Sequence, residues 1–216
     1  MDDVKAITFD VGGTLIEPWP SVGHVYEEVA SRHGVRVKPE ELTRRFVVAW
    51  NRKENFSYTK ADWAALVDDT FIGLTTILPS QSFFEELYSR FSEPDCWHMY
   101  GDVIPTLTTL NERGVRLAVI SNWDTRLRPL LEIIGLADWF ESIHVSSEIG
   151  KTKPDLGIFQ AAINSIGLPS SQILHVGDSE LEDYQGAQAA GMQTRWLCRN
   201  GNVSEDYTIN SLVSLT

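Results

Sequence analysis

Short apolar runs mark the start of the chain and its second half. Their near-continuous apolar character favours strands that are buried on both faces, as in parallel sheets. Helical patterns separate the later runs, and each is followed by a glycine, which is a helix-ending signal. The predicted strands span residues 4–9, 115–120, 142–145, 173–176 and 194–197, and the predicted helices span residues 103–113, 126–134 and 156–166. This alternation predicts an α/β fold with a doubly wound parallel sheet, in a Rossmann-like core.

The segment between residues 17 and 100 has a different pattern. It contains no convincing strand, whereas four amphipathic helices can be drawn at residues 21–33, 39–52, 61–78 and 80–91. We therefore predict an α/β core of residues 1–16 and 101–216 that carries a helical-bundle insert of residues 17–100. Proline-containing segments at residues 18–20 and 93–95 are the expected hinges of the insert.

Polar side chains follow several of the predicted strands. Asp10 follows the first strand, Ser121 and Asn122 follow the second, and Asp178 follows the fourth. In an open parallel sheet, ligands bind outside the carboxyl ends of the strands. Asp10 and Asp178 would form a hard oxygen site suited to Mg²⁺. Lys153 could bring positive charge to the same edge, which a phosphate-bearing substrate needs.

Charge and composition narrow the classes of partner. The 216 residues carry a formal net charge of −12, which would repel the phosphate backbone of a nucleic acid, so we expect no nucleic-acid partner. Cys96 and Cys198 have neither metal-binding nor disulfide-framework spacing. The chain lacks a signal-peptide pattern and an apolar run of about eighteen residues, so we expect a cytoplasmic protein without a membrane span. The pattern leaves the oligomeric state open.

Four short motifs occur in a fixed order along the chain. They are Asp10-x-x-Gly13-Thr14-Leu15, Ser121-Asn122, Lys153-Pro154-Asp155, and Gly177-Asp178 followed by Asp183. Together they resemble the four motifs of the haloacid dehalogenase superfamily, and the helical insert resembles the C1-type cap of that group. The resemblance implies a Mg²⁺-dependent phosphatase that acts on a small phosphorylated metabolite. It also implies a cap that closes over the site and selects the substrate.

The resemblance implies a role for each matching residue. Asp10 would attack the phosphorus and form an aspartyl-phosphate, and Lys153 would neutralise charge and orient Asp10. The side chains of Asp10 and Asp178 and the carbonyl of Gly12 would bind Mg²⁺. The remaining implied roles are phosphoryl binding by Gly12, Gly13, Ser121, Asn122 and Lys153, and support of the site by Asp183 and Thr14.

One position departs from the family pattern. Phosphatases of this family usually carry a second aspartate two residues after the nucleophile, as general acid and base, and this chain has Gly12 there. Such catalysis contributes typically about 10²–10⁴-fold to the rate. Three explanations stay open: a leaving group that needs no proton, another acid such as His24 or Glu148, or a different reaction.

Two other functions therefore compete with the phosphatase. One is a catalytically weak regulatory protein that binds phosphate and Mg²⁺. The other is a haloacid dehalogenase, which Asp178 disfavours because metal-free dehalogenases usually have other residues there. Phosphonate cleavage would need an insert lysine, for which the candidates are Lys38, Lys53 and Lys60. We expect His175 to be a satisfied core histidine, and Trp123 to pack against the insert, with a substrate contact as the alternative.

Overall fold

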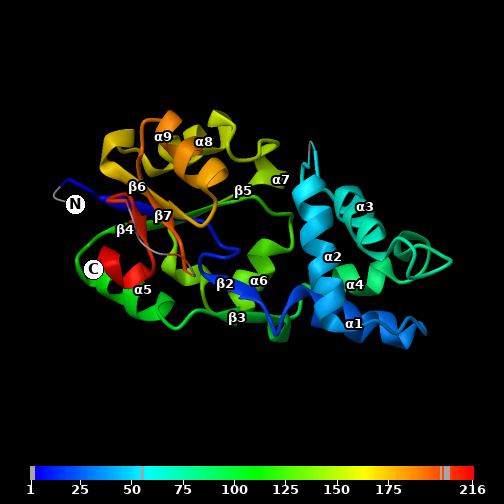
Figure 1. The fold of residues 1–216 in the computed structure, drawn as a ribbon. Helices are drawn as coiled ribbons and strands as arrows, with labels where there is room; N and C mark the ends of the chain where they lie inside the picture. Colours follow the sequence, from blue (N-terminus) through cyan, green and yellow to red (C-terminus); the bar gives the residue numbers. More distant parts are fainter. Residues whose placement is uncertain (1–2, 55, 200, 202–204) are drawn as a thin grey trace. The chain divides into compact units, whose positions relative to one another are not determined.

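The computed structural model describes residues 3–54, 56–199, 201 and 205–216. The chain divides into two compact units (Figure 1). The core unit comprises Met1–Ile16 and Met99–Thr216, and the insert unit comprises Glu17–His98. Among the described residues, no helix has both the length and the hydropathy needed to cross a bilayer.

Within the described residues, the core unit contains a six-stranded sheet with the order β5-β4-β1-β6-β7-β8. All of its neighbouring strands pair in parallel. Its strands are β1 (Ala6–Phe9), β4 (Arg116–Ser121), β5 (Ser142–Val145), β6 (Ile173–Gly177), β7 (Gln193–Leu197) and β8 (Thr208–Ile209). The order runs outward in both directions from β1, so the carboxyl end of β1 is the switch point where such sheets bind ligands.

Helices cover both faces of this sheet, with α8 and α9 over one face and α5 and α6 over the other (Figure 1). The helices of the core unit are α5 (Val103–Glu112), α6 (Leu127–Ile133), α7 (Ser146–Ile149), α8 (Leu156–Ile166) and α9 (Gly186–Ala189), and Glu180–Gln185 form a π-helix. The predicted doubly wound α/β fold is confirmed. Strand β8 is not predicted from the sequence, because two residues are too few to show an alternating pattern.

The sequence accounts for the bounds of α8. The Asp155 side chain caps it by accepting from the backbone N–H of Gly157 at 2.7 Å, and Gly167 ends it in the left-handed conformation at φ 70°. Its apolar face, including Ile158 and Phe159, is buried in the core of the sheet. Burial of such side chains stabilises the packing by about 1.5–3 kcal/mol each.

The insert unit is helical, as the sequence predicts. In its described part the helices are α1 (Val22–Arg32), α2 (Pro39–Arg52), α3 (Lys60–Phe71) and α4 (Phe84–Arg90). They enclose an apolar core that includes Tyr26, Phe71 and Phe83. Two predicted helices are too long: α3 ends before Gly73, which has φ 76°, and Pro79–Gln81 form a 3₁₀ turn before α4.

The prediction of no strand between residues 17 and 100 is wrong. A second, small sheet pairs β2 (Ile16–Pro18) with β3 (Trp97–Met99). Next to it, the backbone N–H of Trp19 donates to the carbonyl of Cys96 at 2.7 Å. Strands of three residues are too short for an alternating pattern to reveal them, and their pairing joins positions about eighty residues apart.

Candidate active site

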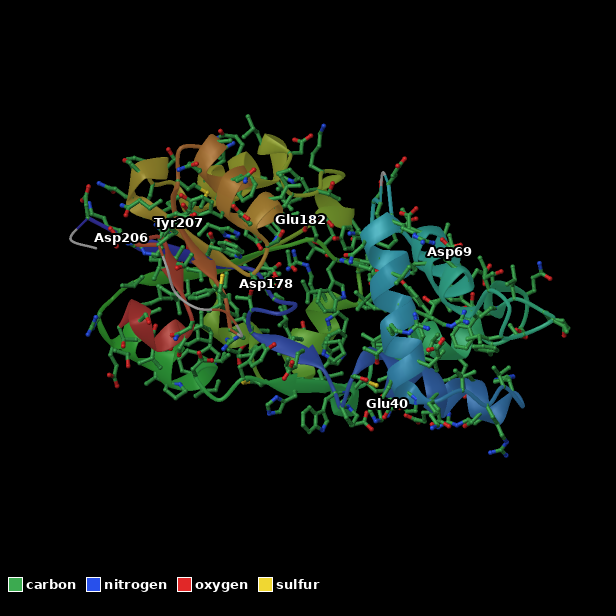
Figure 2. The ribbon with its side chains drawn as sticks, viewed as in Figure 1. Glu40, Asp69, Asp178, Glu182, Asp206 and Tyr207 are labelled. Carbon is green, nitrogen blue, oxygen red and sulfur yellow. The ribbon has the colours of Figure 1, made fainter. Side chains whose placement is uncertain are left out.

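The carboxyl ends of three neighbouring strands carry the central polar side chains. Asp10 directly follows β1, Ser121 is the last residue of β4, and Asp178 directly follows β6. Because β1 lies between β4 and β6 and pairs in parallel with both, these three residues meet at one edge of the sheet. Asp178 and Glu182 are labelled at this edge in Figure 2.

Lys153 joins the nucleophile candidate to a second carboxylate. Its Nζ donates to Oδ1 of Asp10 at 2.7 Å and to Oδ1 of Asp183 at 2.5 Å, and the residue is only 3% exposed. Oγ of Ser121 also donates to Oδ1 of Asp10, at 3.0 Å. The structure therefore brings together four residues that the sequence singles out, although their chemical roles remain predictions.

Asn122 fixes the loop that carries Lys153. Its Nδ2 donates to the backbone carbonyl of Lys153 at 3.0 Å, and its Oδ1 accepts from the backbone N–H of Lys153 at 2.7 Å. Nδ2 also donates to Oε2 of Glu182 at 3.0 Å. The Asn122 side chain thus holds the backbone of Lys153 in place, and its phosphoryl contact stays a prediction. Glu182 is a site neighbour that the sequence analysis missed.

His175 is buried and hydrogen-bonded, but it also belongs to the site. Its Nε2 lies 3.1 Å from Oδ1 of Asp183, and its Nδ1 lies 2.8 Å from Oγ1 of Thr8. The backbone N–H of Ser179 holds the other oxygen of Asp183 at 3.0 Å. Thr8 and His175 face each other in the β1–β6 register, and polar residues at such positions of buried strands are the signal that could have revealed this contact.

The charges of this cluster shift its acid–base equilibria. Burial and the carboxylate of Asp183 raise the pKa of Asp10 against the opposing effect of Lys153. Burial alone would lower the pKa of Lys153, but the Asp10 and Asp183 carboxylates outweigh it and keep the pKa above its ordinary value. Burial would likewise raise the pKa of Asp183, but Lys153 and the hydrogen bond from His175 hold it below its usual range.

Asp178 differs from the other two carboxylates because its residue is exposed to solvent. Nevertheless, protein atoms that displace water around its carboxyl group, together with the negative charges of Asp10 and Asp183, raise its pKa to about 7. Gly13 leaves the space that this carboxylate occupies, since a Cβ at Gly13 would collide with Oδ2 of Asp178.

The donor set fits a hard divalent cation. Oxygens of Asp10, Asp178 and Asp183 lie within 4.8 Å of one another, and Lys153 supplies one positive charge to this group in the described part of the chain. The remaining negative charge would be neutralised by a cation such as Mg²⁺, which prefers carboxylate oxygens. Asp10 and Asp178 would hold it, because hydrogen bonds already engage both oxygens of Asp183.

The turn after β1 contains two further predicted site residues. Gly12 forms an isolated bridge with Ile16. Thr14 is fully buried, its carbonyl accepts from the guanidinium of Arg199 at 2.6 Å, and its Oγ1 has no hydrogen-bond partner among the described residues. Thr14 therefore supports the turn through its backbone and contact with Arg199.

The proposed substitute acids have other partners. Both oxygens of Glu148 accept from the guanidinium of Arg128 at 2.7–3.0 Å. His24 lies in α1 of the insert unit, where its Nδ1 is 2.9 Å from Oγ of Ser21. In the described residues Glu148 is thus engaged with Arg128, and His24 lies beside Ser21; a role of either residue as the substitute acid stays a prediction.

Comparison with known proteins identifies the family of this chain. A model of haloacid dehalogenase-like hydrolases matches residues 4–191. Haloacid dehalogenase-like hydrolase domain-containing protein 3 of Homo sapiens is 34% identical over 203 residues, which cover 88% of this chain and 80% of the relative. The chain belongs to the haloacid dehalogenase-like hydrolase family.

Relatives with different activities share this fold. The crystal structure of a phosphatase of this family from Thermococcus onnurineus is similar with a TM-score of 0.71 and 27% identity, covering 98% of this chain and 96% of that structure. The (S)-2-haloacid dehalogenase of Pseudomonas sp. (strain YL) is 29% identical over 212 residues, covering 95% of this chain and 88% of the relative. Family membership therefore supports a hydrolase, but it does not distinguish a phosphatase from a dehalogenase.

Proposed function

We propose that this protein is a Mg²⁺-dependent phosphatase that acts on a small phosphorylated metabolite through a phosphoryl group on Asp10. The observation that carries the proposal is the contact of Asp10 Oδ1 with both Lys153 and Ser121, beside the carboxylate of Asp178. A carboxylate held in this way is a nucleophile of fixed position, and the adjacent cation and cation site suit an anionic substrate.

The chain's own residues would perform the binding and the displacement. Lys153 would keep Asp10 ionised and offset the charge of the phosphoryl oxygens, and Ser121 would turn its hydroxyl from Asp10 to one of those oxygens. Asp10 would attack the phosphorus while the bond from phosphorus to the leaving oxygen breaks. Water would then attack the phosphorus, break its bond to Asp10 and regenerate the Asp10 carboxylate with release of phosphate. When bound between Asp10 and Asp178, Mg²⁺ would supply electrostatic stabilisation of the phosphoryl group.

A haloacid dehalogenase is the second candidate, because the Pseudomonas relative carries that activity in its name. Asp178 argues against a dehalogenase. Together with Asp10 it offers a cation carboxylate oxygens, whereas metal-free dehalogenases usually have other residues at this position. We therefore favour phosphoryl transfer over displacement of halide from carbon.

Steady-state hydrolysis of p-nitrophenyl phosphate tests the proposal. We expect turnover that requires Mg²⁺ and is abolished in Asp10→Asn, which keeps the size of the side chain but removes its charge. Binding of vanadate or phosphate without turnover would favour the regulatory binding protein instead. Release of halide from a 2-haloacid in the presence of a chelator would favour the dehalogenase.

A further inference from the structure

The backbone does not require glycine at position 12. Gly13 has φ 78°, in the left-handed region that favours glycine, and Gly12 lies outside that region. A side chain at Gly13 would also collide with Asp178. Of these two positions, position 12 is therefore the one where the conformation of the turn is compatible with a side chain. The backbone conformation does not explain why this chain has a glycine there.

The indole ring of Trp123 supplies that explanation. Apart from the immediate chain neighbours, the one atom of the described chain within 4 Å of a Cβ placed on Gly12 is Cζ3 of Trp123, at 3.3 Å. A methyl group at this distance is tight, and the carboxylate of an aspartate would reach further. The edge of the Trp123 ring therefore borders the space into which a side chain at position 12 would extend.

The loop holds Trp123 in this place. Its backbone N–H donates to Oγ of Ser146 at 3.0 Å, and its carbonyl accepts from Oγ of Ser146 at 3.0 Å and from the N–H of Ser147 at 3.2 Å. The residues on either side of Trp123 are held as well. The Asn122 side chain forms hydrogen bonds with the backbone of Lys153, and the buried Asp124 forms an ion pair with Arg126. These bonds fix the backbone from which the Trp123 ring extends, at the same strand end that carries the predicted phosphoryl-binding residues.

An indole cannot replace a carboxylic acid in proton transfer. Its ring N–H donates hydrogen bonds but does not ionise near neutral pH, and the atom that approaches Gly12 is a ring carbon. Glu148, the carboxylate that the sequence offers as a substitute acid, is paired with Arg128. A leaving oxygen beside Gly12 would thus meet an aromatic edge where other phosphatases of the family offer an acid.

We propose that Gly12 and Trp123 together restrict this enzyme to phosphoryl donors whose leaving group is stable as an anion, namely acyl phosphates and aryl phosphates. This inference rests on the proposed phosphatase function and names the substrate class of the same site. In the first step, the Asp10 oxygen forms a bond to phosphorus while the bond to the carboxylate or phenolate oxygen breaks. The leaving oxygen keeps the electron pair and takes no proton from the enzyme.

A series of leaving groups tests this inference. The substrates are acetyl phosphate, p-nitrophenyl phosphate, phenyl phosphate and an alkyl phosphate, each assayed for kcat/KM with Mg²⁺. In the wild type we expect kcat/KM to fall by more than about 10²-fold from p-nitrophenyl phosphate to the alkyl phosphate, because no acid protonates the alkoxide.

A paired set of variants locates the cause. Gly12→Asp combined with Trp123→Ala restores the acid and clears its space, and we expect it to reduce the aryl-to-alkyl ratio about 10-fold or more. Gly12→Asn combined with Trp123→Ala is the matched control, since the amide has the same shape and no acidic proton, and its ratio should stay at the wild-type value. Gly12→Asp alone should gain less than the double variant, because the ring remains.

The outcomes separate this inference from the proposed function. Wild-type turnover of alkyl and aryl phosphates at similar kcat/KM would overturn the inference and leave the phosphatase proposal intact. An unchanged ratio in the double variant, with acetyl phosphate still hydrolysed as evidence of a folded site, would also overturn it. Absence of turnover for every member of the series would overturn both.

Discussion

Lys153 is a buried cation whose charge is matched by carboxylates on two sides. It lies 2.7 Å from Asp10 and 2.5 Å from Asp183, and removal of one partner of a buried ion pair leaves the others uncompensated. The same residue also orients the proposed nucleophile. Its proposed contribution to catalysis and its contribution to stability would therefore come from the same contacts.

Lys153→Met tests this dual role. We expect kcat for p-nitrophenyl phosphate to fall by about 10²-fold or more, because the Asp10 charge and position are no longer maintained. The melting temperature without metal should fall too, since two buried carboxylates lose their cation. Lys151→Met is the control. Lys151 is exposed, and within the described residues its ion pair is with Asp155 at 3.2 Å, so both quantities should hardly change. Equal effects of the two variants would contradict the assignment.

We propose that His175 is a positioning residue, which acts on the proposed nucleophile Asp10 through Asp183 and Lys153. His175→Phe keeps the ring and removes the hydrogen bonds to Asp183 and Thr8. We expect kcat to fall about 10-fold with KM nearly unchanged, a size typical of partners behind a catalytic site. His175→Gln should recover part of the loss because its amide can donate to Asp183. If KM and kcat moved together, and Gln gave no recovery, the contact would be merely structural.

At the scale of the elements, the turn after β1 sets the geometry of the site. Gly13 occupies the left-handed region and borders Asp178, whereas a Cβ on the neighbouring Gly12 would make one tight contact, at 3.3 Å, with a ring carbon of Trp123. We expect Gly13→Ala to weaken Mg²⁺ binding by at least about 10-fold, measured by calorimetry, because the turn and Asp178 must both shift. Gly12→Ala is the matched variant and should bind Mg²⁺ nearly as the wild type does. The reverse order of effects would contradict this view of the turn.

Elements with strong local signals could be predicted from the sequence. Pro39–Arg52 and Leu156–Ile166 have their predicted bounds, because Pro39 opens the first helix and Asp155 caps the second, which Gly167 ends. The short pairing of β2 with β3 could not be predicted, since it depends on residues that are distant in sequence.

Within the site, the residues at the strand ends could be predicted from their positions in the sequence. The contact of His175 with Asp183 and that of Trp123 with Gly12 required the register and the loop geometry.

At the scale of the whole molecule, the chain has a net negative charge, and its candidate site is rich in carboxylates. The formal net charge is −12, and Asp10, Asp178 and Asp183 concentrate part of it within a few ångströms. The raised pKa of Asp178, about 7, means that the folded state disfavours its ionised form. In the absence of metal, this group therefore lowers stability as the pH rises from its ordinary pKa through about 7.

Asp178→Asn tests two effects of the Asp178 charge, namely the loss of stability without metal and the binding of Mg²⁺. At pH 8 without divalent cations, we expect the variant to melt at a higher temperature than the wild type, and the difference should shrink towards pH 5, where the wild-type carboxyl group is largely protonated. Mg²⁺ should raise the melting temperature of the wild type and leave that of the variant almost unchanged. A wild type that is indifferent to Mg²⁺ would argue against a metal site at Asp178.

The covalent phosphoryl-enzyme is the central claim, and mass spectrometry tests it most directly. The enzyme is mixed with acetyl phosphate and Mg²⁺, quenched in acid within the first turnovers, and digested for peptide mapping, with Asp10→Asn as the control. Because Gly12 provides no base to activate water, we expect the intermediate to accumulate. The account predicts one phosphoryl group on the peptide that contains Asp10, labile to hydroxylamine and absent from the variant. Turnover of acetyl phosphate with no such adduct, or with an adduct that persists in Asp10→Asn, would contradict it.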